Sequence, residues 1–232
     1  MFRKKTVGVI IMMLCSFSIF THAQFSVDVN ASLSTSKLTN AGSQWKTAGK
    51  IGMNVDYTFT NKLVLLSGLE CAIKGANSMW SERNGSLLKE FECDLYYLEI
   101  PLSIGYSFRL KDHIKLVPNV GLFFSYGFYG WGEIKSFDFE ADQEMYRNYS
   151  TEWHPFRHGK DNILGGGIEK TPYVMNRFDY GVRIGVNAHV YRLVFLASYE
   201  IGLNDTGLYY GVIGKDGFVR NETFSVGIGY RF

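Results

Sequence analysis

The segment LYYLEIPLSIGYSF, residues 95–108, alternates between apolar positions and polar or small ones. The apolar positions are Leu98, Ile100, Leu102, Ile104, Tyr106 and Phe108. The positions between them include a carboxylate, Glu99, and two hydroxyls, Ser103 and Ser107. A period of two places these two sets on opposite faces of one β-strand. The segment therefore predicts a strand with one continuous apolar face that ends in aromatic side chains.

Seven further segments repeat this alternation, at residues 25–38, 50–59, 63–74, 115–129, 177–190, 193–203 and 223–232. Aromatic residues make up 16% of the chain and there are only 4 prolines, a composition that favours an all-β fold. Long connections follow the odd-numbered segments, whereas the even-numbered ones end in short turns at 60–62, 109–114 and 191–192. Outer-membrane barrels show this asymmetry, with short periplasmic turns and longer outer loops. We expect an eight-stranded antiparallel up-and-down transmembrane β-barrel with both termini periplasmic.

The N-terminus has the features of a secretory signal peptide. Basic residues at positions 3–5 precede a short apolar run, and Ala23 supplies a small residue at the cleavage position. The apolar run is short for an uncleaved membrane anchor. We therefore expect a signal peptide over residues 1–23 and an outer-membrane β-barrel domain over residues 24–232, with a long outer loop at residues 130–176.

Charged residues decide which face of the strands meets lipid. The polar faces carry Glu70, Lys74, Glu99, Asp179, Arg183, Glu200 and Arg231, whereas the apolar strand cores carry no charge. A basic side chain that faces lipid at mid-depth costs about 2–4 kcal/mol, so we expect the apolar faces to point outward. Buried charges need partners, and we expect a structural interior network of Glu70, Glu99, Asp179, Arg183, Glu200 and Arg231. Glu99 and Arg183 are its predicted central members, and acid–base catalysis by the same groups is the alternative.

Apolar side chains also occur on the inward face, near the start of three strands. Val64, Val117 and Val194 are followed by Leu66 and Leu196. We expect them to form an apolar layer that closes the periplasmic end of the lumen. Eight strands leave room only for side chains in the interior, which predicts that the protein forms no steady large conductance.

Two cysteines remain after the predicted signal peptide, Cys71 and Cys93. An exported pair can oxidise, and the two residues flank the same connection. Against this, the alternation places Cys71 on the apolar face and Cys93 on the polar face, so a disulfide would need a bulge or a frayed strand end. The sequence leaves a disulfide between them open.

Four segments together resemble the PorT-like outer-membrane β-barrel family of Bacteroidetes-type bacteria: YLEIPLSIGYSF, VPNVGLFFSYGF, FDYGVRIGVN and FSVGIGYRF. The resemblance covers nearly all of the predicted mature chain, but residues 130–176 contain no motif that contributes to it. It implies the outer membrane of a Gram-negative-type bacterium and a secretion- or envelope-associated role. It also implies that the terminal aromatic residue, Phe232, is a signal for the barrel-assembly machinery.

The function expected is that of a non-enzymatic outer-membrane protein with a structural or surface-interaction role. Its expected partners are outer-membrane lipid and an envelope protein that contacts the outer loops. A formal net charge of only +2 indicates no nucleic-acid partner, and no cofactor, metal or catalytic residue is predicted. A lipid-modifying hydrolase is a first alternative, although His189 has no GxSxG motif near it. A lipocalin-like carrier, with the apolar faces turned inward, is the second.

Overall fold

The computed structural model describes residues 24–39, 43–82, 87–138, 147–156, 175–207 and 219–232. Within these ranges the chain forms ten strands: β1 (Gln24–Leu38), β2 (Lys46–Thr58), β3 (Leu63–Glu82), β4 (Leu87–Tyr106), β5 (Phe108–Lys111), β6 (Ile114–Asp138), β7 (Arg147–Trp153), β8 (Phe178–Val190), β9 (Leu193–Gly202) and β10 (Asn221–Arg231). No helix in the described part of the chain is long and apolar enough to span a membrane. The predicted signal peptide, residues 1–23, lies outside the described residues.

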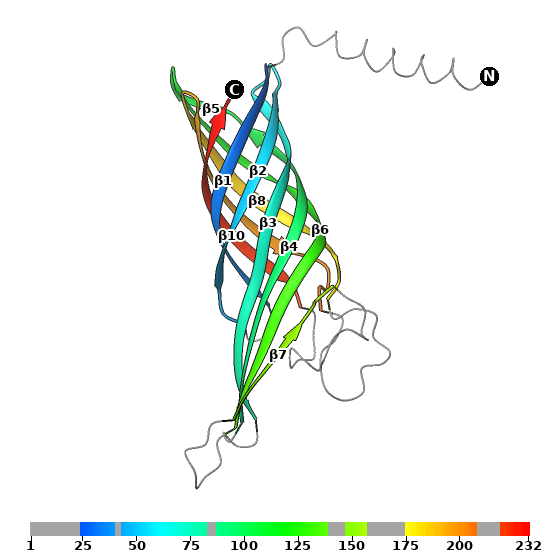
Figure 1. The fold of residues 1–232 in the computed structure, drawn as a ribbon. Helices are drawn as coiled ribbons and strands as arrows, with labels where there is room; N and C mark the ends of the chain where they lie inside the picture. The colour runs from blue at the N-terminus through cyan, green and yellow to red at the C-terminus, as the bar shows by residue number, and fades with distance from the viewer. Residues whose placement is uncertain (1–23, 40–42, 83–86, 139–146, 157–174, 208–218) are drawn as a thin grey trace, which may run out of the picture.

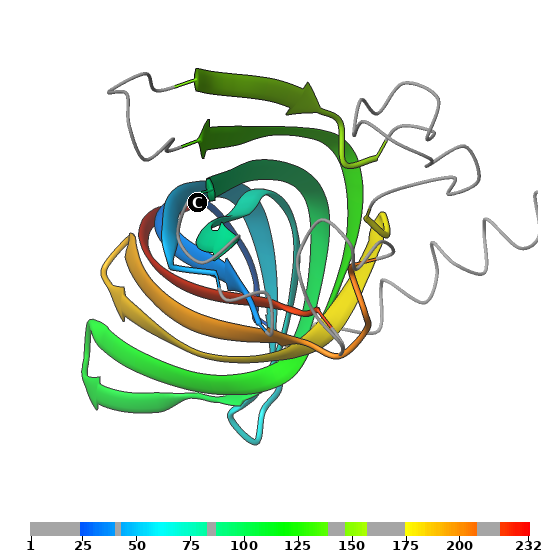
Figure 2. The ribbon, with the colours of Figure 1, turned by 90° about the horizontal axis from the view of Figure 1, so that it is seen from below.

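Eight of these strands form a closed antiparallel barrel (Figures 1 and 2). Hydrogen bonds connect the strands in the order β4–β3–β2–β1–β10–β9–β8–β6, and β6 pairs with β4 to close the ring. Apart from the closure between β1 and β10, each barrel strand pairs with the next barrel strand along the chain. The prediction of an eight-stranded up-and-down barrel is therefore confirmed.

The two ends of the barrel differ in their connections. The turn end, uppermost in Figure 1, has the connections β2–β3, β4–β6 and β8–β9 together with the C-terminus. Two of its turns contain non-glycine residues with positive φ, Lys62 at 69° and Tyr191 at 55°. The expected short connection at 109–114 is partly a strand, because β5 pairs with the start of β6. The opposite end, which we call the loop end, has the other connections.

Three strands extend much further at the loop end than the sequence predicted. β3 and β4 stay paired as far as Glu82 and Leu87, where a polar loop was expected. β6 runs to Asp138 and pairs with β7, so the predicted loop at residues 130–176 begins with two strands. The extensions, residues 75–82, 87–94, 130–138 and 147–153, form a projecting sheet below the barrel in Figure 1. Outside lipid neither face of a sheet must be apolar, so these strands lack the alternation on which the prediction relied.

The side chains alternate between the two sides of the barrel wall as expected. Outward-facing Leu33 is 75% exposed and Ile104 is 60% exposed, whereas inward-facing Asp28 and Glu99 are fully buried. A lipocalin-like carrier requires the reverse arrangement and is therefore excluded. The alternation is interrupted at a β-bulge between β4 and β6. There two successive aromatic residues, Phe128 and Tyr129, both face outward.

Exposed aromatic side chains lie near both ends of the wall. Those at the turn end are Phe59, Tyr106, Phe108, Tyr191, Tyr230 and Phe232, and those toward the loop end are Tyr126, Phe128, Tyr129, Phe178 and Tyr180. Aromatic rings of this kind flank the apolar band of membrane barrels at the level of the lipid headgroups. The band between them therefore has the form of a lipid-facing surface.

Candidate functional site: the barrel interior

The centre of the barrel is organised around the ammonium group of Lys50, which projects inward from β2. Its Nζ atom lies 2.7 Å from a carboxylate oxygen of Glu99, 2.5 Å from one of Glu200 and 3.4 Å from one of Glu70. All four side chains are buried. Oxygen atoms of the three carboxylates lie within 4.8 Å of one another, a spacing that could hold a metal ion. Lys50 contacts all three carboxylates, so its side chain supplies the cation that they require.

Arg183 on β8 adds a second cation to this group. Its guanidinium donates two hydrogen bonds to Glu70, of 2.9 and 3.2 Å, in the paired geometry that strengthens arginine–carboxylate contacts. It also lies 3.6 Å from a Glu200 oxygen and 4.0 Å from a Glu99 oxygen. Arg183 and Glu99 thus lie in the centre of the network, where the sequence analysis expected them.

Lys74 extends the network toward the loop end. Its ammonium group lies 2.8 Å from Glu99 and 3.3 Å from Asp179, and above the ring of Phe123 at 4.3 Å from the ring centre. Ser125 donates a 2.7 Å hydrogen bond to Glu99. Lys74 lies on the inward face, as the alternation predicts, but neither Lys74 nor Lys50 was among the residues predicted for the network.

Arg231 does not belong to this network, which corrects the prediction. Its guanidinium pairs with Asp56 and, at 3.5 Å, with Asp28, near the turn end. The cause is the strand register: Arg231 pairs with Asp28 across β10 and β1, whereas Glu200 pairs with Thr223, far back along β10. The interior therefore has two separate ion clusters along its length. We call them the central cluster (Lys50, Glu70, Lys74, Glu99, Asp179, Arg183 and Glu200) and the turn-end cluster (Asp28, Asp56 and Arg231).

An apolar layer lies at the turn end. Val64, Leu66 and Val117 pack against one another, and Val194 and Leu196 are buried on the neighbouring wall. These are the side chains that were expected to close the lumen. A polar cavity of about 30 Å³, lined by residues of both this layer and the central cluster, has room for about two water molecules.

A second apolar group closes the barrel toward the loop end. It contains Leu38, Ala76, Phe91, Cys93, Leu95, Tyr97, Phe156, Met175 and Val219. The ring of Phe156 packs edge-on against Tyr97 at 5.8 Å, and Arg177 holds the segment by donating a 2.7 Å hydrogen bond to the Phe156 carbonyl. The described interior is therefore filled in successive layers from one end to the other.

The two cysteines are both free, and the disulfide that the sequence left open is absent. Cys71 is exposed on the outer wall, whereas Cys93 is buried in the loop-end apolar group. In the pairing of β3 with β4, Cys71 is opposite Leu98 and Cys93 is opposite Ala76. The two thiols therefore lie at different levels and on opposite faces of the wall.

His189, the histidine considered for a hydrolase, lies buried in the wall near the turn end. Its neighbours on the adjacent strands are Lys115 and Val194, neither of which is a nucleophile suited to acyl transfer. In the central cluster every carboxylate contacts a lysine or arginine. The arrangement supports charge pairing inside a closed barrel, and no part of it resembles a catalytic triad.

Comparison of the sequence with models of known protein families identifies one matching family. Residues 17–207 match the family described as outer membrane protein beta-barrel domain. No curated protein sequence matches the chain.

Solved structures similar to this chain include neisserial surface protein A, with 13% identity, a TM-score of 0.41 and coverage of 90% of this chain and 99% of that one. Another is the attachment invasion locus protein Ail of Yersinia pestis in complex with the heparin analogue sucrose octasulfate, with 15% identity, a TM-score of 0.38 and the same coverage. A third is a major outer membrane protein of Thermus thermophilus, with 12% identity, a TM-score of 0.38 and coverage of 90% and 99%.

Proposed function

This chain belongs to the outer membrane protein beta-barrel domain family, and we propose that it is a non-enzymatic barrel that presents its loop end to a partner protein of the cell envelope. The observation that carries the proposal is the filled interior. Apolar layers at both ends and a paired ion cluster between them leave no space in the described lumen for a substrate. The outer wall faces lipid, so specific contacts with other macromolecules are confined to the ends of the barrel.

The projecting sheet is the part of the loop end best suited to this role. It extends four paired strands away from the barrel, and in the described chain β7 has only β6 as a neighbour. A rigid sheet presents side chains and a strand edge more reproducibly than a loop does. On β3 it exposes Met79, an apolar side chain that is 56% exposed.

We further propose that the turn end and both termini are periplasmic, with residues 1–23 removed as a signal peptide. The start of β1 and the C-terminus lie together at the end with the short turns (Figure 1), which is the orientation general to such barrels. Phe232 is 77% exposed, and its backbone N–H bonds to the Val27 carbonyl at 3.0 Å, so its ring is available to the barrel-assembly machinery. The PorT-like resemblance supports a role close to a secretion or envelope machine.

Protease treatment of intact cells tests the orientation. We expect cleavage within residues 130–176, and no cleavage in the turns at 60–62 and 191–192 until the outer membrane is permeabilised. Cleavage at the turns of intact cells would reverse the proposed orientation.

Site-specific photocrosslinking tests the proposed partner. A photoreactive amino acid in place of Met79 should crosslink to an envelope protein in growing cells. The matched control is Ile184, which is 52% exposed on the lipid-facing wall and should give no protein crosslink. Crosslinking at Ile184 but not at Met79 would contradict a role of the loop end.

A further inference from the structure

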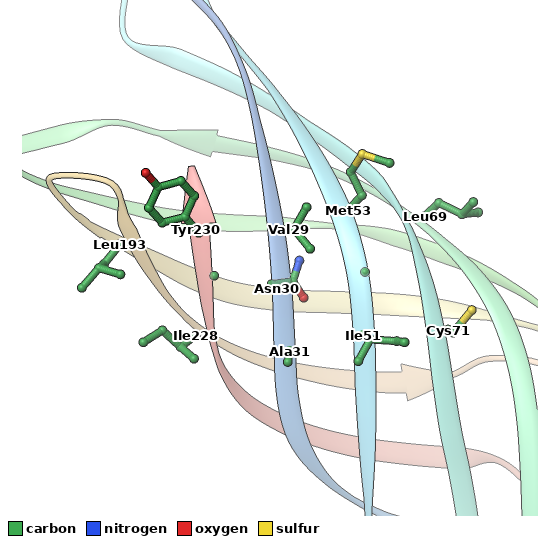
Figure 3. A pocket seen from close by; sticks show the side chains of 12 residues that line it. Val29, Asn30, Ala31, Ile51, Met53, Leu69, Cys71, Leu193, Ile228 and Tyr230 are labelled. Carbon is green, nitrogen blue, oxygen red and sulfur yellow. The ribbon is translucent and has the colours of Figure 1, made fainter. Parts of the chain in front are cut away.

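The outer wall contains an apolar hollow, which arises from the sizes of the side chains that pair across neighbouring strands. The hollow has a volume of about 820 Å³ and lies across β9, β10, β1, β2 and β3 (Figure 3). Ala31 lines the hollow on its loop-end side (Figure 3) and pairs with Ile228 on β10 and with Ile51 on β2. A single methyl group between two long side chains leaves the wall recessed along this row. Met53 and Leu69 form the far side of the hollow.

The hollow continues toward the loop end. A second hollow of about 480 Å³ shares Ala31, Ile51 and Cys71 with the first, and it reaches Tyr96 and Phe128. Both volumes lie within the range of small-ligand sites. Together they form an apolar furrow that runs from Tyr230, near the turn end, to the aromatic residues near the loop end.

A cation lies at the turn-end mouth of this furrow. The exposed guanidinium of Arg192 donates a 3.0 Å hydrogen bond to the hydroxyl of Tyr230, and Tyr230 and Leu193 both line the furrow. The surrounding surface has the same sign of charge. The turn-end connections contain four exposed basic residues, Lys62, Arg109, Lys111 and Arg192, and one exposed acidic residue, Asp112.

We propose that this furrow binds an anionic diacyl phospholipid, with its phosphate on Arg192 and an acyl chain over Ala31. A guanidinium binds phosphate oxygens through paired hydrogen bonds, and a tyrosine hydroxyl at the headgroup level orients it. The furrow is apolar along its length and therefore accepts hydrocarbon but not a polar chain. The site goes beyond the proposed function, because it is on the wall and the turn end rather than on the loop end.

Native mass spectrometry of the protein purified from outer membranes in detergent tests this site. The protein is titrated with palmitoyl-oleoyl phosphatidylglycerol and, separately, with the zwitterionic phosphatidylcholine of the same chains. Phosphatidylglycerol should bind more tightly. Arg192→Gln should weaken phosphatidylglycerol binding about fivefold and phosphatidylcholine binding less, because the choline ammonium offsets the charge of its phosphate. The control Lys135→Gln, on the projecting sheet at the loop end, should have no effect on either lipid.

Filling the furrow tests the acyl-chain part separately. Ala31→Phe should weaken both lipids about tenfold, equivalent to fewer than two buried methylene groups. Ala188→Phe, on the outward face of β8 away from the furrow, is the matched control. Heat-dependent gel mobility verifies that each variant is folded.

Labelling of Cys71 gives a second readout, because this thiol lines the furrow. Phosphatidylglycerol should slow its reaction with a membrane-soluble maleimide more than phosphatidylcholine does. Equal binding of the two lipids by the unmodified protein, or unchanged binding after Ala31→Phe, would overturn the proposal. So would a dimer that Ala31→Phe abolishes, because the furrow would then bind a second copy of the chain.

Discussion

Lys50 is the single residue on which the central cluster depends most, because three buried carboxylates share its ammonium group. Removal of one partner from a buried ion cluster leaves uncompensated charge and costs about 3–5 kcal/mol. We therefore expect Lys50→Met to lower the free energy of unfolding by about that amount. Urea unfolding of the barrel in detergent, followed by tryptophan fluorescence, measures it.

Two further variants test whether the loss of stability comes from the central cluster and not from the removal of a lysine as such. Lys37→Met removes a partly exposed pair with Glu222 and should cost less than about 1 kcal/mol. Adding Glu200→Gln to Lys50→Met removes one of the buried carboxylates that lost its lysine partner, and it should restore part of the lost stability. Equal costs for Lys50→Met and Lys37→Met would show that the central cluster contributes little.

The two cysteines should differ sharply in reactivity. Burial in the loop-end apolar group raises the pKa of the Cys93 thiol to about 12, so almost none of it is the reactive thiolate at neutral pH. In the folded barrel we expect a membrane-soluble maleimide to modify Cys71 and to leave Cys93 unmodified until the protein is unfolded. Mass spectrometry counts the added groups, and a mass gain of two hydrogens on reduction would reveal a disulfide that the structure lacks.

The alternation along the strands also predicts which further charged side chains face the interior. Lys50 comes directly before Ile51, so the alternation places it inward, but it stands at the first position of the predicted strand, where the alternation alone does not indicate burial. Asp28 and Asp56 were on the expected polar face as well. Their pairing with Arg231 could not be predicted, because it depends on how β1 and β10 align when the barrel closes, a contact between opposite ends of the chain.

At the level of elements, the strands inside the lipid band were predictable and the projecting sheet was not. Lipid forces an alternation of apolar and inward-facing residues, which fixed the segments around Ile100 and Val226 to within a few residues. Beyond the aromatic residues that constraint ends. β7 and the ends of β3 and β6 are held by backbone hydrogen bonds to their neighbours, which no side-chain pattern records.

Gly127 on β6 lies against Phe156, in the segment that follows β7. A Cβ atom on Gly127 would lie 2.4 Å from the ring of Phe156, so any larger residue there must displace the ring. We expect Gly127→Val to destabilise the barrel by about 1–3 kcal/mol, the usual range for overpacking. Hydrogen exchange should show faster opening of the β6–β8 pairing near Arg177, whose side chain bonds to both residues' carbonyls.

A compensating change tests whether this steric conflict is the cause. Gly127→Val combined with Phe156→Ala should exchange no faster than Phe156→Ala alone, because the ring that the valine would displace is gone. An additional loss in the double variant would place the effect of the valine in the strand itself.

The whole molecule combines an apolar exterior with an interior closed at three levels. The turn-end layer, the central cluster and the loop-end group each fill the described lumen. We therefore expect no steady large conductance from the purified protein in a planar bilayer, and the same result after Val64→Ser and Leu66→Ser hydrate the turn-end layer. The second result follows because the central cluster, in which Lys50, Arg183 and three glutamates meet, closes the barrel independently. Single-channel recording, with a reference porin as the positive control, measures both conductances. Stable porin-like current steps from the unmodified protein would show an open path through the barrel. Current steps from the serine variant alone would show that the turn-end layer is the sole barrier.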